Sequence, residues 1–214
     1  MHGFDHCRRH FWNSSNSKYQ IDSRIMSTMT TLADSSKIAS LVSELAGQIN
    51  TAISANESTH PWAIVGIRSR GDLLAGRISE QLDSSVIEER LGVLDITLYR
   101  DDLSEITHQP VVRTTEIPFD IDGMNIVLVD DVLMSGRSIR AALQSLMDLG
   151  RPRRIWLAVL VDRGGRELPI SADFVAVDLK SQQLDSDTII DVHLTPLDEQ
   201  DCITTHPKQK GPTK

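Results

Sequence analysis

The most informative segment of the chain reads Val127-Leu128-Val129-Asp130-Asp131-Val132-Leu133-Met134-Ser135-Gly136-Arg137-Ser138-Ile139. It starts as an apolar strand, places two adjacent carboxylates where that strand ends, and continues through small and hydroxyl-bearing residues into a helix. The residues expected on the buried side of this helix, which ends at Gly150, are Ile139, Ala142, Leu143, Leu146 and Met147. Another apolar run, residues 155–161, follows as a buried strand. Strand, helix and strand without a hairpin signal predict a βαβ unit, and therefore a parallel sheet.

The same segment carries the chemistry of a sugar phosphate site. In an open parallel sheet, ligands bind beyond the carboxyl ends of the strands. Backbone N–H groups at a helix N-terminus, beside the hydroxyls of Ser135 and Ser138, attract an anion, and the carboxylates of Asp130 and Asp131 accept hydrogen bonds from hydroxyls. A solvated turn followed by ordinary helix capping would look similar. A receiver domain also has an acidic pair, but it places the pair after an early strand and lacks the glycine-hydroxyl loop.

Further elements can be placed on either side of this unit. An amphipathic helix is expected from Asp34 to about Ile53, and a second helix after residues 68–72. Strands are expected at residues 63–67, 95–100, 173–177 and 189–194. The polar stretch 101–115 is expected to be a long loop, and such loops are usually functional or disordered.

Bulk composition limits the class of protein. The chain has 214 residues, of which 40% are hydrophobic and 24% charged, as in an ordinary globular α/β domain. Its longest apolar run is too short to span a membrane, so we expect no membrane association. The net charge of −8 argues against a surface that binds nucleic acid throughout. The two cysteines, Cys7 and Cys202, form no disulfide framework or metal spacing, which fits a reducing cytoplasm.

The chain is expected to divide into one domain with two tails. Residues 1–28 form either a disordered extension or a mis-assigned start, with translation beginning at Met26 or Met29. Their histidines and Cys7 match no zinc spacing. The domain is expected over residues 29–200, with a C-terminal tail over 201–214.

Residues 127–139 resemble the signature that binds phosphoribosyl pyrophosphate (PRPP) in type I phosphoribosyltransferases. Residues 66–71, 97–103 and 161–170 narrow the resemblance to the bacterial pyrimidine operon regulators that are also uracil phosphoribosyltransferases. The likeness covers roughly residues 64–197, with the motifs in the same order. It implies a type I phosphoribosyltransferase fold: an α/β domain with a mostly parallel twisted sheet flanked by helices, a small hood and a flexible lid loop.

The resemblance assigns roles to particular residues. Asp130 and Asp131 would accept hydrogen bonds from the ribose 2′ and 3′ hydroxyls. The backbone N–H groups of residues 134–138, with the hydroxyls of Ser135 and Ser138, would hold the 5′-phosphate. The expected pyrophosphate loop consists of Arg68, Ser69, Arg70 and Gly71. The lid would carry Arg100, which counts with the two aspartates as catalytic. The residues expected to bind the base are Val161, Asp162 and Arg163.

The implied reaction joins uracil to PRPP, giving UMP and pyrophosphate. Mg²⁺ is expected to bind mainly through PRPP, with no direct protein ligand. Hypoxanthine or orotate, without an RNA role, is the alternative substrate class. A homo-oligomer, dimer or higher, is also expected.

The resemblance further implies UMP-dependent binding of the leader mRNA of pyrimidine genes. The first helix offers only Lys37 against Asp34 and Glu44, so it is a poor basic surface. Met134 stands where the family often has an aromatic residue, and Gly165 where it often has histidine. The remaining candidates for phosphate contact are Arg163, Arg166, Arg151, Arg153 and Arg154.

Overall fold

The computed structural model describes residues 30–56, 60–83, 87, 90–101, 114–182, 184–185 and 187–208. The expected N-terminal extension, nearly all of the expected lid loop and residues 209–214 lie outside these ranges. The described helices and strands are β1 (Thr30–Ala33), α1 (Ser35–Ala55), β2 (Trp62–Ile67), α2 (Arg70–Ser79), β3 (Leu91–Leu94), the short 3-10 helix η2 (Thr97–Tyr99), β4 (Asn125–Leu133), α4 (Arg137–Leu149), β5 (Arg154–Asp162), β6 (Phe174–Asp178), the 3-10 helix η4 (Lys180–Gln182), β7 (Thr188–His193) and β8 (Cys202–Pro207). Among them, no helix combines the length and apolar character that a membrane crossing needs.

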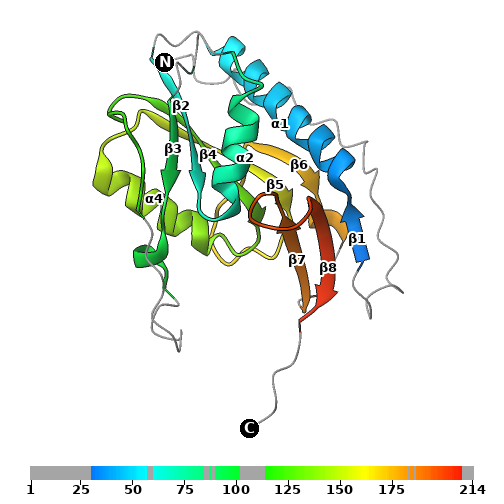
Figure 1. The fold of residues 1–214 in the computed structure, drawn as a ribbon. Coiled ribbons are helices and arrows are strands. Elements are labelled where there is room, and N and C mark those ends of the chain that lie inside the picture. Colours follow the sequence, from blue (N-terminus) through cyan, green and yellow to red (C-terminus); the bar gives the residue numbers. More distant parts are fainter. Residues whose placement is uncertain are drawn as a thin grey trace, which may run out of the picture.

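A parallel sheet forms the centre of the molecule, and it confirms the predicted βαβ unit. Within the described chain its strand order is β3-β2-β4-β5-β6, and all neighbours run parallel (Figure 1). The chain passes outward from β2 to β3 on one side, and from β4 to β5 and β6 on the other. The strand order therefore reverses between β2 and β4, which is where an open α/β sheet binds its ligand.

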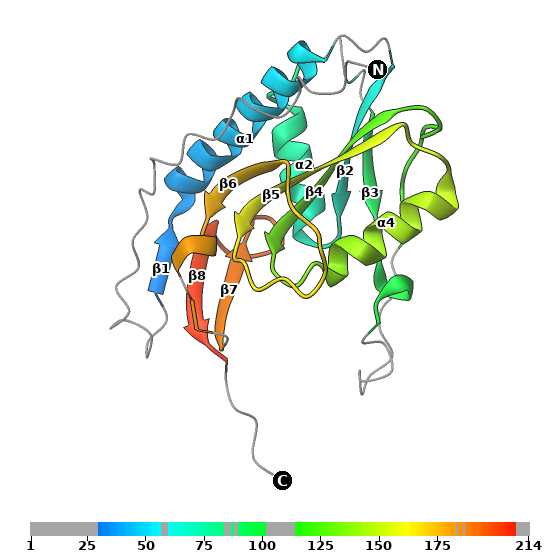
Figure 2. The same cartoon turned by 180° about the vertical axis from the view of Figure 1, so that it is seen from behind.

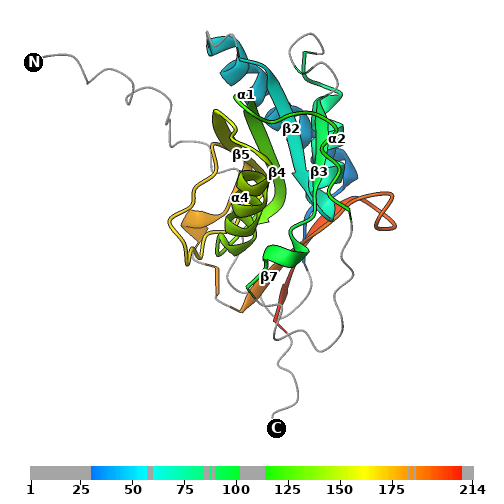
Figure 3. The same ribbon diagram turned by 90° about the vertical axis from the view of Figure 1, so that its left-hand side faces the viewer.

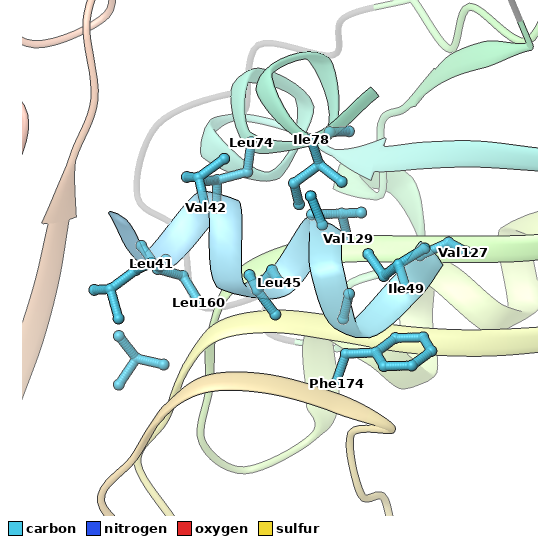
Figure 4. Packing of buried hydrophobic residues seen from close by; sticks show 14 of the residues in the cluster. Leu41, Val42, Leu45, Ile49, Leu74, Ile78, Val127, Val129, Leu160 and Phe174 are labelled. Carbon is cyan, nitrogen blue, oxygen red and sulfur yellow. The ribbon is translucent and has the colours of Figure 1, made fainter. Parts of the chain in front are cut away.

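Helices cover both faces of this sheet, with α1 and α2 on one face and α4 on the other (Figures 2 and 3). Alternate side chains of β4 belong to the two hydrophobic clusters, one on each face of the sheet. Val127 and Val129 point toward α1, whose Leu45 and Ile49 pack against the sheet (Figure 4), while Ile126 and Leu128 join the cluster under α4. The first helix forms as predicted, since Asp34 caps it by accepting the N–H of Lys37 at 2.9 Å.

A smaller antiparallel sheet, with order β1-β8-β7, lies beyond the ends of the central strands (Figure 1). It is made from the two ends of the described chain, so residues far apart in sequence form one layer. Residues 202–207, expected within a C-terminal tail, instead form the central strand of this sheet. We refer to this sheet and the loop 194–201 as the hood.

Other local predictions were wrong, each for a physical reason. Residues 95–100 are not a strand: Asp95 accepts the N–H of Thr97 at 2.7 Å and turns the chain into η2, while the strand lies earlier, at β3. β4 does not end before Asp130 but continues to Leu133, because β5 pairs with it over that length. Met147 is 55% exposed and lies on the outer side of α4.

Candidate active site

A cavity of about 380 Å³ lies at the point where the strand order reverses. It is lined by Ile67, Arg68, Ser69, Arg70, Asp95, Ile96, Thr97, Arg100, Asp130, Asp131, Val132 and Ser138. These residues lie at or just beyond the carboxyl ends of β2, β3 and β4, which share one edge of the sheet. The structure thus brings together the three residues predicted to be catalytic, most of the pyrophosphate loop and part of the signature segment.

The acidic pair lies where β4 extends past its neighbour β2. The last β2–β4 pair is Gly66 with Val129, whereas β4 and β5 stay paired beyond it. Asp130 is therefore held inside the sheet and is only 7% exposed, and its Oδ1 accepts the N–H of Asp131 at 3.0 Å. Burial, together with the neighbouring charge of Asp131, raises the pKa of Asp130 well above its usual value.

Asp131 is better prepared to carry a negative charge. Burial raises its pKa as well, but the N–H of Val132 donates to its Oδ1 at 2.8 Å, and the positive charge of Arg70 acts in the opposite direction to burial. The charge of Arg70 favours the ionised form of Asp131, whereas burial and the charge of Asp131 disfavour that of Asp130. The two side chains thus have different ionisation properties at the same strand end.

The expected pyrophosphate loop is a tight connection between β2 and α2, and the glycines on either side of Arg68 to Arg70 allow close backbone approach. A Cβ on Gly66 would lie 2.4 Å from Cα of Asp72, and one on Gly71 would lie 2.5 Å from the carbonyl oxygen of Val129. Such distances exclude any side chain unless the backbone moves. The start of α2 is therefore packed directly against β4, beside the acidic pair.

Arginines supply the positive charge of the cavity. Arg68 donates to Glu116 Oε1 at 2.9 Å, while its Nε is buried without a hydrogen-bond acceptor among the described residues. Arg70 pairs with Asp198 of the hood, and Arg100 is exposed at the rim. An unsatisfied buried donor in a cavity wall suits an anionic ligand.

The signature loop ends in a helix N-terminus whose N-cap residue has no side chain, and the first N–H of the helix, that of Arg137, donates to Ser135 Oγ at 3.3 Å. Gly136 occupies the N-cap position with a left-handed φ of 90°, and α4 begins directly after it. Ser138 lines the cavity, but residues 134–137 do not. Ser135 faces the next loop, since its carbonyl accepts the N–H groups of Glu167 and Leu168, both at 3.0 Å.

The residues predicted to bind the base do not line the cavity. Val161, Asp162 and Arg163 are all buried. Arg163 donates hydrogen bonds to the backbone carbonyls of Thr188 and Asp185. Asp162 Oδ2 accepts a hydrogen bond from Arg166 Nη2 at 2.6 Å. Arg163 and Asp162 therefore join the end of β5 to β7 and to the following loop, and the role of all three residues at the base stays a prediction.

The five arginines predicted to contact RNA fall into two groups, one at each end of β5. Arg163 is 7% exposed, and Arg166 donates to the carbonyls of Leu133, Met134 and Ile170 as well as to Asp162. These guanidinium groups hold the loop together, which argues against direct phosphate contact. The exposed arginines are those just before or at the start of β5: Arg151, Arg153 and Arg154.

Comparison with known proteins agrees with this geometry. The phosphoribosyl transferase domain model matches residues 28–199. The chain is 51% identical over 158 residues to the bifunctional protein PyrR of Thermus aquaticus, covering 73% of this chain and 86% of that protein. It is 44% identical over 174 residues to PyrR of Deinococcus radiodurans, covering 81% and 92%. The chain belongs to the PyrR family of phosphoribosyl transferases.

Solved structures agree on the fold of this PyrR family member. The hypoxanthine phosphoribosyltransferase of Trypanosoma cruzi superimposes with a TM-score of 0.60 at 16% identity, covering 84% of this chain and 97% of that one. At this low identity the likeness bears on the fold alone. The fold is that of type I phosphoribosyltransferases, as predicted.

Sequence reasoning missed several polar residues of the site. Asp95 would have been found if β3 had been located correctly, because it then follows a strand end at the same edge as Asp130. No local sequence pattern marks Asp198 or Glu116 as a residue of the site. Asp198 contacts Arg70 from 128 residues away, and Glu116 contacts Arg68 from 48 residues away. A single sequence does not reveal pairs of this kind.

Proposed function

We propose that this chain transfers the phosphoribosyl group of PRPP to uracil, giving UMP and pyrophosphate. The observation that carries the proposal is the cavity itself. It joins an acidic pair, three arginines (Arg68, Arg70 and Arg100) and the N-terminus of α4 at one strand edge. A ligand with ribose hydroxyls, a 5′-phosphate and a diphosphate complements these groups.

The residues would act mainly by charge placement. As the bond between C1′ and pyrophosphate breaks, the ribose gains positive, oxocarbenium-like character, which the carboxylate of Asp131 stabilises. The leaving pyrophosphate gains negative charge, which Arg68 and Arg100 offset. Uracil then bonds to C1′ through one ring nitrogen, and the proton of that nitrogen is released to solvent. No covalent intermediate with the protein is required.

Mg²⁺ fits this site as a companion of the diphosphate. Among the described residues, no cluster of three or more His, Cys, Asp or Glu side chains could hold a metal ion. Asp130 and Asp131 line the same cavity as the expected diphosphate, whose oxygen atoms are the hard ligands that Mg²⁺ prefers, so the ion would be held mainly through PRPP. When bound, the ion would supply positive charge toward the leaving group.

The second half of the proposal is regulation of pyrimidine genes by UMP-dependent binding to their leader mRNA. The support is the relationship to proteins named bifunctional PyrR. Arg151, Arg153 and Arg154 form the exposed cationic group best placed to meet RNA phosphates. A cytoplasmic location and a homo-oligomeric state belong to the same proposal.

A panel of bases tests the enzymatic proposal. The purified protein is mixed with PRPP, Mg²⁺ and either uracil, hypoxanthine or orotate, and nucleotide and pyrophosphate are quantified. We expect UMP from uracil, with pyrophosphate in equal amount and little product from the other bases. Faster turnover of hypoxanthine or orotate would show that this base, and not uracil, is the substrate. No turnover with any base would refute the enzymatic function.

A further inference from the structure

The hood is attached to α2 by two bidentate ion pairs, Arg70 with Asp198 and Arg77 with Asp201. Asp198 accepts two hydrogen bonds from Arg70, at 3.0 Å from Nε and 2.9 Å from Nη2. Asp201 accepts two from Arg77, at 2.5 Å from Nη1 and 3.1 Å from Nη2. Both arginines belong to α2, seven positions apart, so they lie on the same side of the helix. Both aspartates belong to the loop that joins β7 to β8.

The pairs differ in their relation to the cavity: Arg70 lines it and Arg77 does not. Arg77 also donates through Nη2 to the carbonyl oxygen and Oγ1 of Thr195. The burial of the two pairs is close, with side-chain exposures of 31% and 17% for Arg70 and Asp198, and 27% and 15% for Arg77 and Asp201. The carboxylates are also fixed in similar ways by the loop backbone. Asp198 accepts the N–H of Leu194 at 2.8 Å, and Asp201 that of Thr195 at 2.7 Å.

The orientation of Arg70 follows from this contact. A guanidinium has five N–H donors in a rigid plane, and the bidentate contact with Asp198 uses those on Nε and one on Nη2. The remaining donors belong to the end of the group away from the carboxylate. Arg70 also interacts electrostatically with Asp131, so its charge acts on the acidic pair as well as on the hood.

We propose that Asp198 is a positioning residue that holds Arg70 in the cavity wall, with its remaining donors directed at the diphosphate of PRPP. The inference rests on the proposed function and adds a residue from outside the motifs that identify the family. Because Asp198 is fixed in turn by Leu194 N–H and lies near His193 Nδ1 (3.3 Å), the hood itself sets the position of the arginine. The loop between β7 and β8 therefore determines PRPP affinity without touching PRPP.

The test compares Asp198→Asn with Asp201→Asn. Asn keeps the shape of the side chain but removes the charge and one strong acceptor. Isothermal titration gives the dissociation constant for PRPP with Mg²⁺ in the absence of uracil, steady-state kinetics give kcat and both KM values, and melting temperatures report stability. Asp201→Asn is the matched control, because it weakens the ion pair of the same loop with Arg77, a residue of the same helix that does not line the cavity.

We expect Asp198→Asn to raise the dissociation constant and KM for PRPP about ten-fold or more, with the KM for uracil little changed, as for the loss of a charge-assisted bidentate contact. Asp201→Asn should lower the melting temperature to a similar extent but leave the PRPP constant within about two-fold. Asp198→Glu, which keeps a bidentate acceptor, should recover part of the affinity. If Asp198→Asn does not fold, Arg70→Lys is expected to show the same loss, since an ammonium cannot make the bidentate contact.

Equal PRPP affinity in wild type and Asp198→Asn would overturn the inference and leave the pair as a structural tie. An equal loss in Asp201→Asn would also overturn it, because general loosening of the hood would then explain the effect. A wild type that binds PRPP but forms no UMP would contradict the proposed function alone, and the affinity comparison would still decide the role of Asp198.

Discussion

Asp131 combines partial exposure to the cavity with a nearby cation, and Asp130 beside it is almost fully buried. Asp131→Asn should therefore lower kcat/KM for PRPP by about 10²-fold or more, because a charge that stabilises the developing oxocarbenium ion is lost. Asp173→Asn is a suitable control: that carboxylate accepts Leu157 N–H at 2.8 Å just before the start of β6, at the opposite edge of the sheet. Activity of Asp131→Asn equal to that of the control would remove Asp131 from the site.

Asp130 makes a different prediction, which concerns stability. Its pKa is raised by burial and by the charge of Asp131, so the folded protein favours the protonated form. The stability it contributes is complete below the pKa of the unfolded chain and is lost as pH rises through the raised folded value. Asp130→Asn mimics the protonated acid, so without PRPP its melting temperature should exceed that of wild type at pH 8 and approach it at pH 4. A variant less stable at both pH values would contradict the stated cause of the shift.

At the scale of elements, the site depends on how closely α2 approaches β4. Gly71→Ala would place a Cβ 2.5 Å from the carbonyl oxygen of Val129, which forces the helix away from the acidic pair. We expect a loss of roughly 1–3 kcal/mol in the free energy of unfolding, together with weaker PRPP binding. Thermal melting and calorimetric titration measure the two effects.

Gly76 in the same helix is the control for that prediction. Apart from the neighbouring backbone of α2, no atom of the described residues lies within 4 Å of a Cβ built there, so Gly76→Ala should leave PRPP binding unchanged and stabilise the helix by up to about 1 kcal/mol. If both alanine variants bind PRPP like wild type, close packing of α2 is not what positions the pyrophosphate loop.

The elements also show how far sequence reasoning reached. The βαβ unit could be predicted because β4, α4 and β5 each carry a continuous local pattern. β3 was not predicted because it is short, Leu91–Leu94, and contains a glycine. The residues after it alternate between apolar and polar side chains like a strand, but Asp95 accepts the N–H of Thr97 and turns the chain into η2. β8 was missed because its residues are largely polar and gain their place only by pairing with both β1 and β7.

The site was predictable to the same degree and for the same reason. The signature, the pyrophosphate loop and Arg100 are local motifs, and the fold brings them to one cavity. The burial of Arg163 and the contact of Asp198 with Arg70 depend on where the hood docks, which no local pattern encodes. Such non-local ion pairs follow only from the folded arrangement of the whole chain.

At the scale of the whole molecule, the proposed RNA surface and the cavity lie at opposite edges of the sheet. Nine-residue β5 runs between them, so Arg154 and Asp162 are separated by roughly 26 Å at the usual rise per residue. Replacing Arg151, Arg153 and Arg154 by alanine should leave uracil turnover unchanged and lower RNA affinity. The slope of log affinity against log salt should fall by about 0.7 for each RNA phosphate that is no longer neutralised.

UMP should strengthen RNA binding, and RNA should strengthen UMP binding by the same factor, since coupling between two sites is reciprocal. Titrations of leader RNA with and without UMP, at two salt concentrations, measure both quantities. An unchanged salt slope in the triple variant would place the RNA elsewhere. An absence of binding at low salt with saturating UMP would show that the chain is an enzyme alone.

The central claim is that PRPP binds in the cavity beyond β2 and β4. The most direct measurement is a titration of the ¹⁵N-labelled protein with PRPP and Mg²⁺, followed by backbone amide resonances. We predict saturable shifts in the pyrophosphate loop (68–71) and at the start of α4 (136–139), with residues 151–154 at the opposite edge unaffected. Shifts confined to that opposite edge, or no saturable shift in either cavity segment, would contradict the claim.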